Sequence, residues 1–391
     1  MNTIKEKCIK LYAFIFKLFG IVLPKCDRVI IFESFLGKQF SDNPRAIYEY
    51  IKEHYPEYKL YWSVERKSIQ KFKKYNVKFV KRFSFRWLVL MNCSKYWITN
   101  SRLPLWIPKS RRTIYVQTWH GTPLKKLGLD IEEVQMAETT TEKYKREFIL
   151  ESSKWDYLIS PNAYSTGIFK RAFNFNKTII ESGYPRNDYL INNNNKTEVN
   201  KIKQKLGLPK DKKIILYAPT WRDNQFYSKG HYKFDLNLDL DLLNEKLSND
   251  FILLFRMHYL ISENLTLSGY DGFVFDLSDH EDIRELYLIA DILITDYSSA
   301  FFDYSILERP IIFYVYDIDE YRNNIRGFYI NFEDEVPGPI VNNTKQLIET
   351  IRTIDMERNL FEKIVNFKHK YCYLEDGNSS KRVVETIFNI Q

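Results

Sequence analysis

A histidine stands just after a stretch that the sequence predicts to be a β-strand. The run from Thr113 to Thr118 is rich in β-branched and aromatic residues, and Trp119 separates it from His120. An imidazole has a pKa near neutrality, so a histidine in such a loop can take a proton from a hydroxyl group. Thr122 and Pro123 are typical of a helix start, which predicts a strand, a loop and a helix, with His120 beside the electropositive helix end. The same residues also fit a histidine that is buried in, or caps, a strand-to-helix turn.

A second turn could bind an anion. The apolar run from Ile292 to Thr295 leads into a hydroxyl-rich turn with Asp296, Ser298 and Ser299, and a helix is predicted to follow. Backbone amides at a helix N-terminus, together with serine hydroxyls, can hold a phosphate or pyrophosphate against the positive end of the helix dipole. Asp303, one turn further on, is then suitably placed for ribose hydroxyls. Alternatively, Asp296 and Ser298 merely cap the helix.

Polar residues follow several predicted strands at the point where each strand ends. In open α/β sheets, ligands bind outside the carboxyl ends of the strands, so these residues are expected to line one site. His258 alone would more often be an ordinary loop histidine, but it follows the apolar run Phe251–Phe255 and adjoins Arg256, which favours a functional role. The residues at these strand ends are Asn100 and Ser101, His120, Ser160, Thr220 to Asp223, Arg256 to His258, and Asp296 to Ser299.

Apolar runs alternate with helix-like stretches along the 391 residues, which predicts parallel sheets with helices on both faces. A polar, low-complexity stretch, Asn192 to Asn195 with Lys196 to Asn200, marks a loop or linker near the middle. The fold class is therefore α/β, with two doubly wound domains. The predicted strands are Val29–Glu33, Leu60–Val64, Tyr96–Thr99, Thr113–Thr118, Tyr157–Ile159 and Thr178–Glu181, and then Ile214–Ala218, Phe251–Arg256, Phe273–Asp276, Ile292–Thr295 and Ile311–Tyr314.

The chain resembles the CDP-glycerol glycerophosphotransferase family, the teichoic-acid primases and polymerases of Gram-positive bacteria. The resemblance extends from roughly Val29 to Tyr373, and it implies a GT-B-like fold in which two Rossmann-like domains face a cleft. One departure is Tyr259, where the family often has a proline that would stiffen the loop of His258. The resemblance rests on Trp119–Pro123, Gly183–Asp188, Tyr217–Asp223, Arg256–His258 and Thr295–Ser299.

The resemblance implies an enzyme that transfers glycerol phosphate from CDP-glycerol to a hydroxyl of an undecaprenyl-diphosphate-linked saccharide and releases CMP. His120 would be the general base, and His258 would stabilise charge on the leaving phosphate. No cofactor or metal site is expected, although Asp223 and Asp296 leave room for a loosely bound magnesium ion. The expected CDP-glycerol-binding residues are Thr220, Arg222, Asp223, Arg256, Asp296, Ser298, Ser299 and Asp303, and the expected acceptor-side residues are Asn100, Gly121, Thr122 and Lys125.

Composition and charge narrow the function classes. The four cysteines form no CxxC or Cys/His pattern, which argues against zinc or a disulfide framework and suits a reducing cytoplasm. The net charge of +8 suits a polyphosphate, nucleic acid or an anionic membrane. No helix-turn-helix, zinc-finger or RNP-type pattern is present, so a nucleic-acid partner is not expected. Two alternative functions are a CDP-ribitol transferase and a sugar-transferring GT-B enzyme. The sequence does not decide between transfer of a single unit and polymerisation, and it does not give the oligomeric state.

Residues 1–25 are expected to form an amphipathic helix that associates with the membrane. Lys17 interrupts the apolar segment, and the uncharged run Leu11–Phe16 is too short to cross a bilayer. A helix in the membrane plane, with lysines toward lipid phosphates, fits better than a signal peptide without a small-residue cleavage site, and a packed helix is the alternative. The protein is therefore expected to be peripheral, at the cytoplasmic face of the cell membrane. An acceptor-side domain over 26–200 and a nucleotide-binding domain over 201–391 follow, and the last helix is expected to pack back on the first domain.

Overall fold

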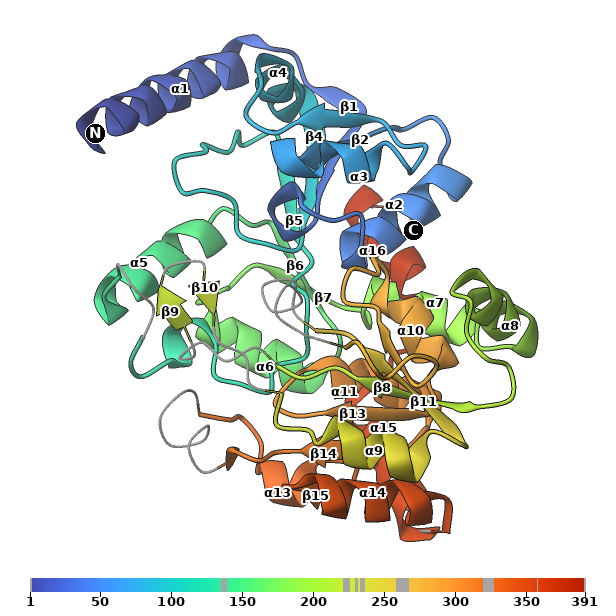
Figure 1. The fold of residues 1–391 in the computed structure, drawn as a ribbon. Coiled ribbons are helices and arrows are strands. Elements are labelled where there is room, and N and C mark those ends of the chain that lie inside the picture. Colours follow the sequence, from blue (N-terminus) through green and yellow to red (C-terminus); the bar gives the residue numbers. More distant parts are fainter. Residues whose placement is uncertain are drawn as a thin grey trace.

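The computed structural model contains two parallel β-sheets, one above the other in Figure 1, each covered by helices. It describes residues 2–134, 139–220, 226–228, 231–232, 236–257, 267–318, 327–356 and 358–389. We call the part that carries the first sheet the N-terminal domain and the part that carries the second sheet the C-terminal domain. The predicted α/β class and the two-domain GT-B-like arrangement are confirmed.

The first sheet has the strand order β3-β2-β1-β4-β5-β6-β7, and its neighbouring strands are parallel. Because the order reverses direction next to β1, the carboxyl ends of β1 and β4 open into a crevice where a ligand can bind. The strands are β1 (Cys26–Glu33), β2 (Lys59–Val64), β3 (Phe79–Lys81), β4 (Ser94–Thr99), β5 (Ile114–Gln117), β6 (Tyr157–Ser160) and β7 (Thr178–Glu181).

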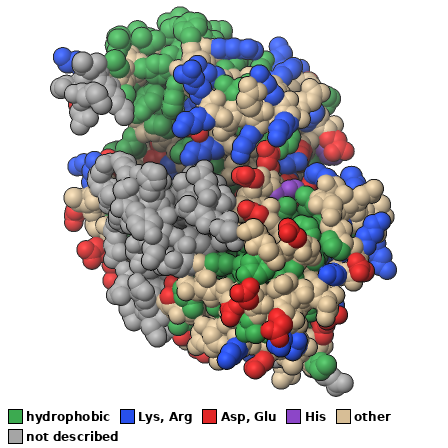
Figure 2. Space-filling view, viewed as in Figure 1, with side chains coloured by type: hydrophobic (Ala, Val, Ile, Leu, Met, Phe, Trp, Pro, Cys, Tyr) green, Lys and Arg blue, Asp and Glu red, His purple; other side chains and the backbone are tan. Residues whose placement is uncertain are grey.

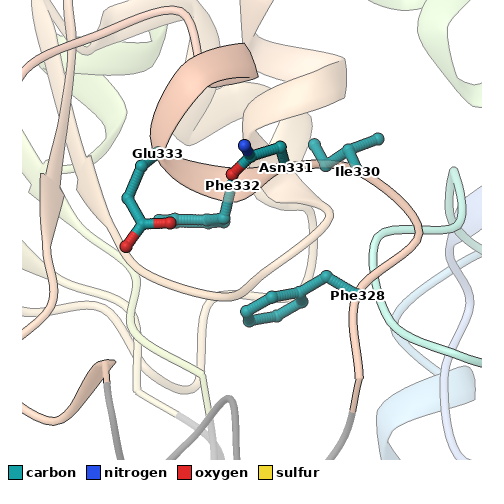
Figure 3. A pocket seen from close by; sticks show the side chains of 5 residues that line it. All are labelled: Phe328, Ile330, Asn331, Phe332 and Glu333. Carbon is teal, nitrogen blue, oxygen red and sulfur yellow. The ribbon is translucent and has the colours of Figure 1, made fainter.

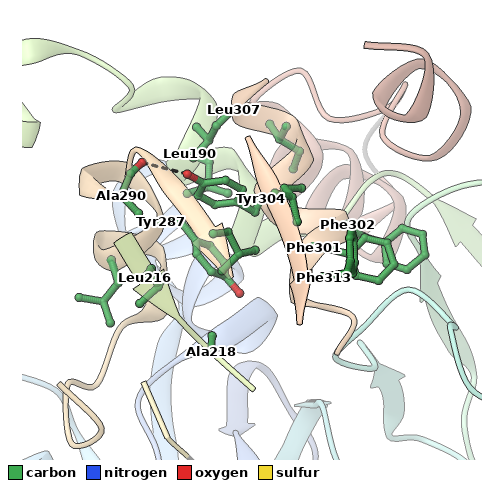
Figure 4. Close-up of a cluster of buried hydrophobic side chains, with 14 of the residues drawn as sticks. Leu190, Leu216, Ala218, Tyr287, Ala290, Phe301, Phe302, Tyr304, Leu307 and Phe313 are labelled. Atoms are coloured by element: carbon green, nitrogen blue, oxygen red, sulfur yellow. Dashed lines mark hydrogen bonds between the residues drawn. The ribbon is translucent and has the colours of Figure 1, made fainter. Parts of the chain in front are cut away.

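The second sheet has the order β12-β11-β8-β13-β14-β15 and is also parallel. Successive side chains of a strand point to opposite faces, so β8 contributes Ile214 and Leu216 to one buried cluster and Ile215 and Tyr217 to another. Figure 4 shows the first of these clusters. The strands are β8 (Lys213–Tyr217), β11 (Phe251–Phe255), β12 (Val274–Asp276), β13 (Ile292–Thr295), β14 (Ile311–Tyr314) and β15 (Ile340–Val341).

Each predicted strand is present in the structure. The short edge strands β3 and β15, and the separate antiparallel pair β9 (Phe226–Ser228) and β10 (His231–Tyr232), were not predicted. The main helices are α1 (Asn2–Val22), α2 (Asp42–His54), α3 (Ile69–Phe72), α4 (Phe85–Cys93), α5 (Thr141–Ser152), α6 (Ala163–Ala172), α7 (Asp188–Asn192), α8 (Lys196–Lys205), α9 (Leu240–Leu247), α10 (Ile283–Ile289), α11 (Ala300–Tyr304), α13 (Phe332–Glu335), α14 (Thr344–Thr353), α15 (Arg358–Tyr371) and α16 (Ser379–Phe388).

The polar stretch near the middle of the chain is only partly a loop. The residues 196–200 were predicted to belong to a loop or linker, but they form the first turns of α8. The side chain of Asn195 accepts a hydrogen bond from the Glu198 amide at 3.0 Å, which caps this helix. The prediction for these residues is wrong because capping and a buried Ile202 outweigh a polar composition.

The last helix of the chain, α16, packs on the N-terminal domain. Its buried residues Val383, Val384 and Ile387 belong to the same cluster as Ile30 and Phe32 of β1. In Figure 1 the helix lies behind α2, in the upper half of the molecule. The end of the chain therefore returns to the N-terminal domain and ties the two domains together.

The N-terminal helix α1 buries one side and exposes the other. Phe16 is fully buried, and its ring lies 5.9 Å from that of Trp87 in α4. The opposite side exposes a row of large apolar side chains, and Phe85 of α4 beside it is 70% exposed. Figure 2 shows this apolar surface, with lysines and arginines nearby, at the top of the molecule. Among the described residues, no helix is long and apolar enough to cross a membrane. The exposed apolar residues of α1 are Leu11, Phe14, Leu18, Ile21 and Val22.

Candidate active site between the two domains

We call residues 118–127 the His120 loop. Strand β5 precedes this loop as predicted, but the structure has no helix at Pro123. Instead the chain crosses to the C-terminal domain, where Lys125 forms a β-bridge with Phe328. The predicted helix is wrong because backbone pairing between the domains outweighs the local helix-start signal. His120 consequently has no helix N-terminus of its own loop beside it.

The imidazole of His120 is solvent-accessible, and its ring lies 5.9 Å from that of Phe35. Its Nδ1 is 2.8 Å from the carbonyl oxygen of Asn100. Because a carbonyl only accepts hydrogen bonds, Nδ1 carries the proton and Nε2 is left to accept one. The Trp119 ring stacks on the imidazole at 4.6 Å. The surrounding protein lowers the pKa of His120 below its ordinary value, although the nearby Asp42 acts in the opposite direction.

Asn100, an expected acceptor-side residue, holds the His120 region together. Its side chain is fully buried, and its Oδ1 accepts a hydrogen bond from the backbone amide of Phe35 at 2.8 Å. Its Nδ2 donates to the hydroxyl of Ser34 and to a carboxylate oxygen of Asp42, both at 3.1 Å. The side chain therefore fixes the carbonyl that orients His120.

The predicted anion-binding turn lies at the carboxyl end of β13. Asp296 is buried, and its Oδ1 accepts a hydrogen bond from the Thr220 amide at 2.7 Å, so these two expected donor-binding residues come together. The Ser298 hydroxyl accepts from the amide of Ala300 at 3.2 Å, at the start of α11. Ser298 and Ser299 are both half-buried and remain partly accessible. A bound phosphate and a helix cap are both compatible with this geometry.

The His120 loop touches the anion-binding turn. A methyl group built on Gly121 would lie only 2.6 Å from the Ser299 hydroxyl oxygen, so the Ser299 side chain occupies the space that a side chain at position 121 would need. Thr122 is buried next to this contact, and Lys125 is half-buried further along the loop. Two segments that are about 180 residues apart in the sequence thus form one site, with the histidine on one side and the serine hydroxyls on the other.

Asp303 is buried in an ion pair between the domains. The Arg186 guanidinium donates to its two carboxylate oxygens at 3.1 Å, and the Asn187 amide group donates to it at the same distance. The remaining arm of Arg186 reaches Asp42 at 2.9 Å. The expected contact of Asp303 with a ribose stays a prediction.

Arg256 also follows a strand end at this edge of the C-terminal sheet. Its amide donates to the carbonyl of Tyr217 at 2.9 Å, and burial lowers the pKa of its guanidinium, against the influence of nearby acidic groups and Tyr287. Three other predicted residues, Arg222, Asp223 and His258, lie outside the described residues. No group of three or more His, Cys, Asp or Glu side chains in the described part of the chain could hold a metal ion.

A pocket of about 230 Å³ opens beside the crossing of the His120 loop. Figure 3 shows the Phe328 ring on one side and Phe332 with Glu333 on the other. Phe328 forms the bridge to Lys125, but none of the predicted site residues lines this pocket. It lies next to the candidate active site and is not part of it.

Comparison with known proteins identifies the family. Residues 15–389 match the sequence profile of the CDP-glycerol:poly(glycerophosphate) glycerophosphotransferases. The chain belongs to this family. Among similar members, the teichoic acid poly(glycerol phosphate) polymerase of Bacillus spizizenii is 58% identical over 97% of this chain and 96% of the relative. The teichoic acid glycerol-phosphate transferase of Staphylococcus aureus is 48% identical over 99% of both chains.

A solved structure has the same fold over the whole chain. The wall teichoic acid polymerase TagF superimposes with a TM-score of 0.89 and 43% identity, over 99% of this chain and 96% of the other. The family resemblance that was inferred from the motifs is therefore confirmed.

Sequence reasoning missed the polar residues that connect the two sides of the site. Asp42 and Asn43 look like an ordinary helix start, and Arg186 stands in the Gly183–Asp188 motif without an assigned role. Their partners are more than 50 residues away along the chain. A local pattern could not have paired them.

Proposed function

We propose that this protein transfers glycerol phosphate from CDP-glycerol to an acceptor hydroxyl in teichoic acid synthesis. The observation that carries this proposal is the contact between Gly121 and Ser299. It brings a histidine with a free Nε2 next to a turn whose amides and hydroxyls suit a phosphate. Family membership supplies the donor, and the geometry supplies the groups that the reaction needs.

In the proposed reaction, the Nε2 of His120 removes the proton of the acceptor hydroxyl as its oxygen attacks the phosphorus that bears the glycerol. A new P–O bond forms, the bond between the two phosphates breaks, and CMP leaves with the bonding electron pair. Ser298 and Ser299 donate hydrogen bonds to the phosphate oxygens as charge develops on them. His258 and Arg222, by the family motif, are further proposed donors.

The protonation state of His120 suits a general base. A base must be unprotonated before it can take a proton, and a lowered pKa keeps the imidazole neutral at neutral pH. The hydrogen bond to Asn100 stabilises the imidazolium that forms after proton transfer, because Nδ1 remains a donor. The site therefore holds the base in the productive tautomer before the substrate arrives.

The proposed acceptor is a lipid-linked saccharide at the cytoplasmic face of the membrane, where the enzyme binds peripherally. The exposed apolar row of α1 supports this attachment, because apolar side chains gain from burial among acyl chains and neighbouring lysines gain from anionic headgroups. Phe85 lies beside α1, with its ring 5.8 Å from that of Phe19, and extends the same surface.

The function is tested by incubating the protein with a lipid-linked disaccharide and either CDP-glycerol, CDP-ribitol or a nucleotide-sugar. Mass analysis of the lipid product should show added glycerol phosphate, together with released CMP, only with CDP-glycerol. His120→Ala should abolish the product while the melting temperature stays near that of the native protein. Addition of ribitol phosphate or of a sugar would replace the proposal with one of the alternatives, and the number of added units separates single transfer from polymerisation.

Membrane attachment is tested with substitutions, since deleting α1 would uncover the buried surface under Phe16. A variant with Leu11, Phe14 and Ile21 changed to serine should bind less to vesicles that contain anionic lipid. The matched control changes three exposed apolar residues elsewhere, Leu150, Met356 and Phe361, to serine. Equal sedimentation of the two variants with vesicles would show that α1 is not the attachment surface.

A further inference from the structure

A chain of buried polar groups connects the anion-binding turn to His120 across the domain boundary. It begins at Asp303 in α11, which directly follows Ser298 and Ser299, and passes through Arg186 to Asp42 at the start of α2. Asp42 then contacts the Asn100 side chain, and the Asn100 carbonyl accepts the hydrogen bond of His120. Each link is a hydrogen bond or ion pair of 2.8 to 3.1 Å.

In this chain of contacts the Arg186 guanidinium lies between two carboxylates, those of Asp42 and Asp303. The side chains of Arg186, Asp42 and Asp303 are 8%, 8% and 11% exposed. Burying three charges is costly, and two carboxylates with one guanidinium contribute little net stability compared with apolar packing. The planar fork of arginine can bond both carboxylates at once in fixed directions, which an ammonium group cannot do.

The backbone around this chain of contacts is strained on the N-terminal side. Asp42 has φ of 63° and Trp119, next to His120, has φ of 52°, both in the left-handed region that side chains disfavour. Asn43 donates to the carbonyls of Thr118 and Trp119 and accepts from the Arg186 amide at 3.1 Å. The turn that begins α2 thus holds both the His120 loop and Arg186. Strained backbone persists only where the surrounding structure holds it in place, and it is common at functional sites.

We propose that Arg186 and Asp42 are positioning residues, which hold His120 in register with the turn that binds the donor phosphates and set the charge beside its imidazole. The proposal rests on the function proposed above. It adds that the two domains must be locked through Arg186 before the base and the donor are aligned. Neither residue touches the reacting atoms.

The charged groups near His120 shift the pKa of its imidazole in opposite directions. Desolvation by the surrounding protein lowers the pKa of His120, Asp42 and the hydrogen bond to the Asn100 carbonyl raise it, and Arg186 lowers it. Replacing Asp42 by a neutral residue removes the raising contribution and leaves the arginine in place. The pKa of His120 should then fall, so the imidazole stays unprotonated down to a lower pH.

The decisive variant is Asp42→Asn. Asparagine adopts positive φ more readily than other residues with a side chain, so the backbone is retained. Its Oδ1 still accepts from Arg186 and from the Asn43 amide, while the negative charge and the acceptor for Asn100 Nδ2 are lost. We expect the acid limb of kcat/KM to move to lower pH, by on the order of one pH unit. Arg186→Lys keeps the charge but loses the fork, so kcat should fall by about tenfold or more while the acid limb stays in place.

The matched control is Arg45→Lys, which weakens another ion pair between the domains, the 3.0 Å contact with Asp282, without a link to His120. It should keep kcat and the acid limb of the native protein. If Arg45→Lys lowers kcat as much as Arg186→Lys does, the effect is general loosening of the interface and the proposal is wrong. An unmoved acid limb in a folded Asp42→Asn variant overturns it as well.

A measurement without turnover separates this proposal from the proposed function. The protein has six histidines, and the ring signals of His120 can be assigned by comparison with His120→Gln after selective labelling. NMR titration of the native protein and of Asp42→Asn gives the pKa of His120 directly. A lower pKa in Asp42→Asn supports the electrostatic role even if no product forms with CDP-glycerol, and an equal pKa refutes it. If Asp42→Asn does not fold, the loss of kcat in Arg186→Lys relative to Arg45→Lys decides the positioning role.

Discussion

Gly121→Ala should inactivate the enzyme without unfolding it. The added methyl group would lie 2.6 Å from the Ser299 hydroxyl oxygen, whereas ordinary contact begins at 3.4 Å. The His120 loop and the anion-binding turn must therefore separate by about 0.8 Å, or the Ser299 side chain must rotate away from its position beside Gly121. Misplacement of reacting groups by about 1 Å costs roughly a hundredfold in rate, which corresponds to about 2 to 3 kcal/mol of transition-state stabilisation.

The assay is kcat/KM with CDP-glycerol and a soluble acceptor, measured together with the melting temperature. Gly167→Ala serves as the control, because Gly167 lies within α6, has no atom within 4 Å of the added methyl group, and should lose no activity. In a Ser299→Ala background the remaining contact is 3.3 Å, so the extra loss from Gly121→Ala should shrink to less than about tenfold. The reasoning is refuted if Gly121→Ala keeps near-native activity, or if its effect is equally large in both backgrounds.

Three further predictions concern pH and donor binding. Because the pKa of His120 is lowered, kcat/KM should be constant through neutral pH and fall only below about pH 6.5; an acid limb centred above that value would contradict a general base at this position. Burial raises the pKa of Glu375 to about 8, so its folded form stays protonated where the unfolded chain is ionised, and its contribution to stability is lost as pH rises from about 4.5 to 8. Glu375→Gln should therefore raise the melting temperature relative to the native protein by an amount that grows over this window and is constant above it, and parallel melting curves at every pH would disprove the assignment. Ser298→Ala combined with Ser299→Ala should weaken CDP-glycerol binding in calorimetry, and unchanged affinity would leave the turn as a helix cap only.

The strands were predictable because their signal is local. Runs such as Phe251–Phe255 are apolar throughout, as expected for a strand that is buried on both faces, and each run is short and bounded by polar residues. The polar residues at their carboxyl ends followed from sheet topology, so Asp296 and Thr220 were expected near each other before their hydrogen bond was seen. The short strand β3 has only three residues, which is too little for a pattern to detect.

What could not be predicted depends on contacts between the domains. Thr122 and Pro123 carry a genuine helix-start signal, but Lys125 pairs with a backbone segment about 200 residues away, and no local pattern contains that partner. The same holds for Asp303, whose spacing from the serine turn suggested a ribose contact while its closest protein partner, Arg186, comes from the other domain. In the proposed reaction the base and the donor site lie on different domains, so the residues that align them are distant in sequence. Those residues are recognised only when both domains are seen together, and for that reason the Asp42→Asn and Gly121→Ala variants test the structure and not the motifs.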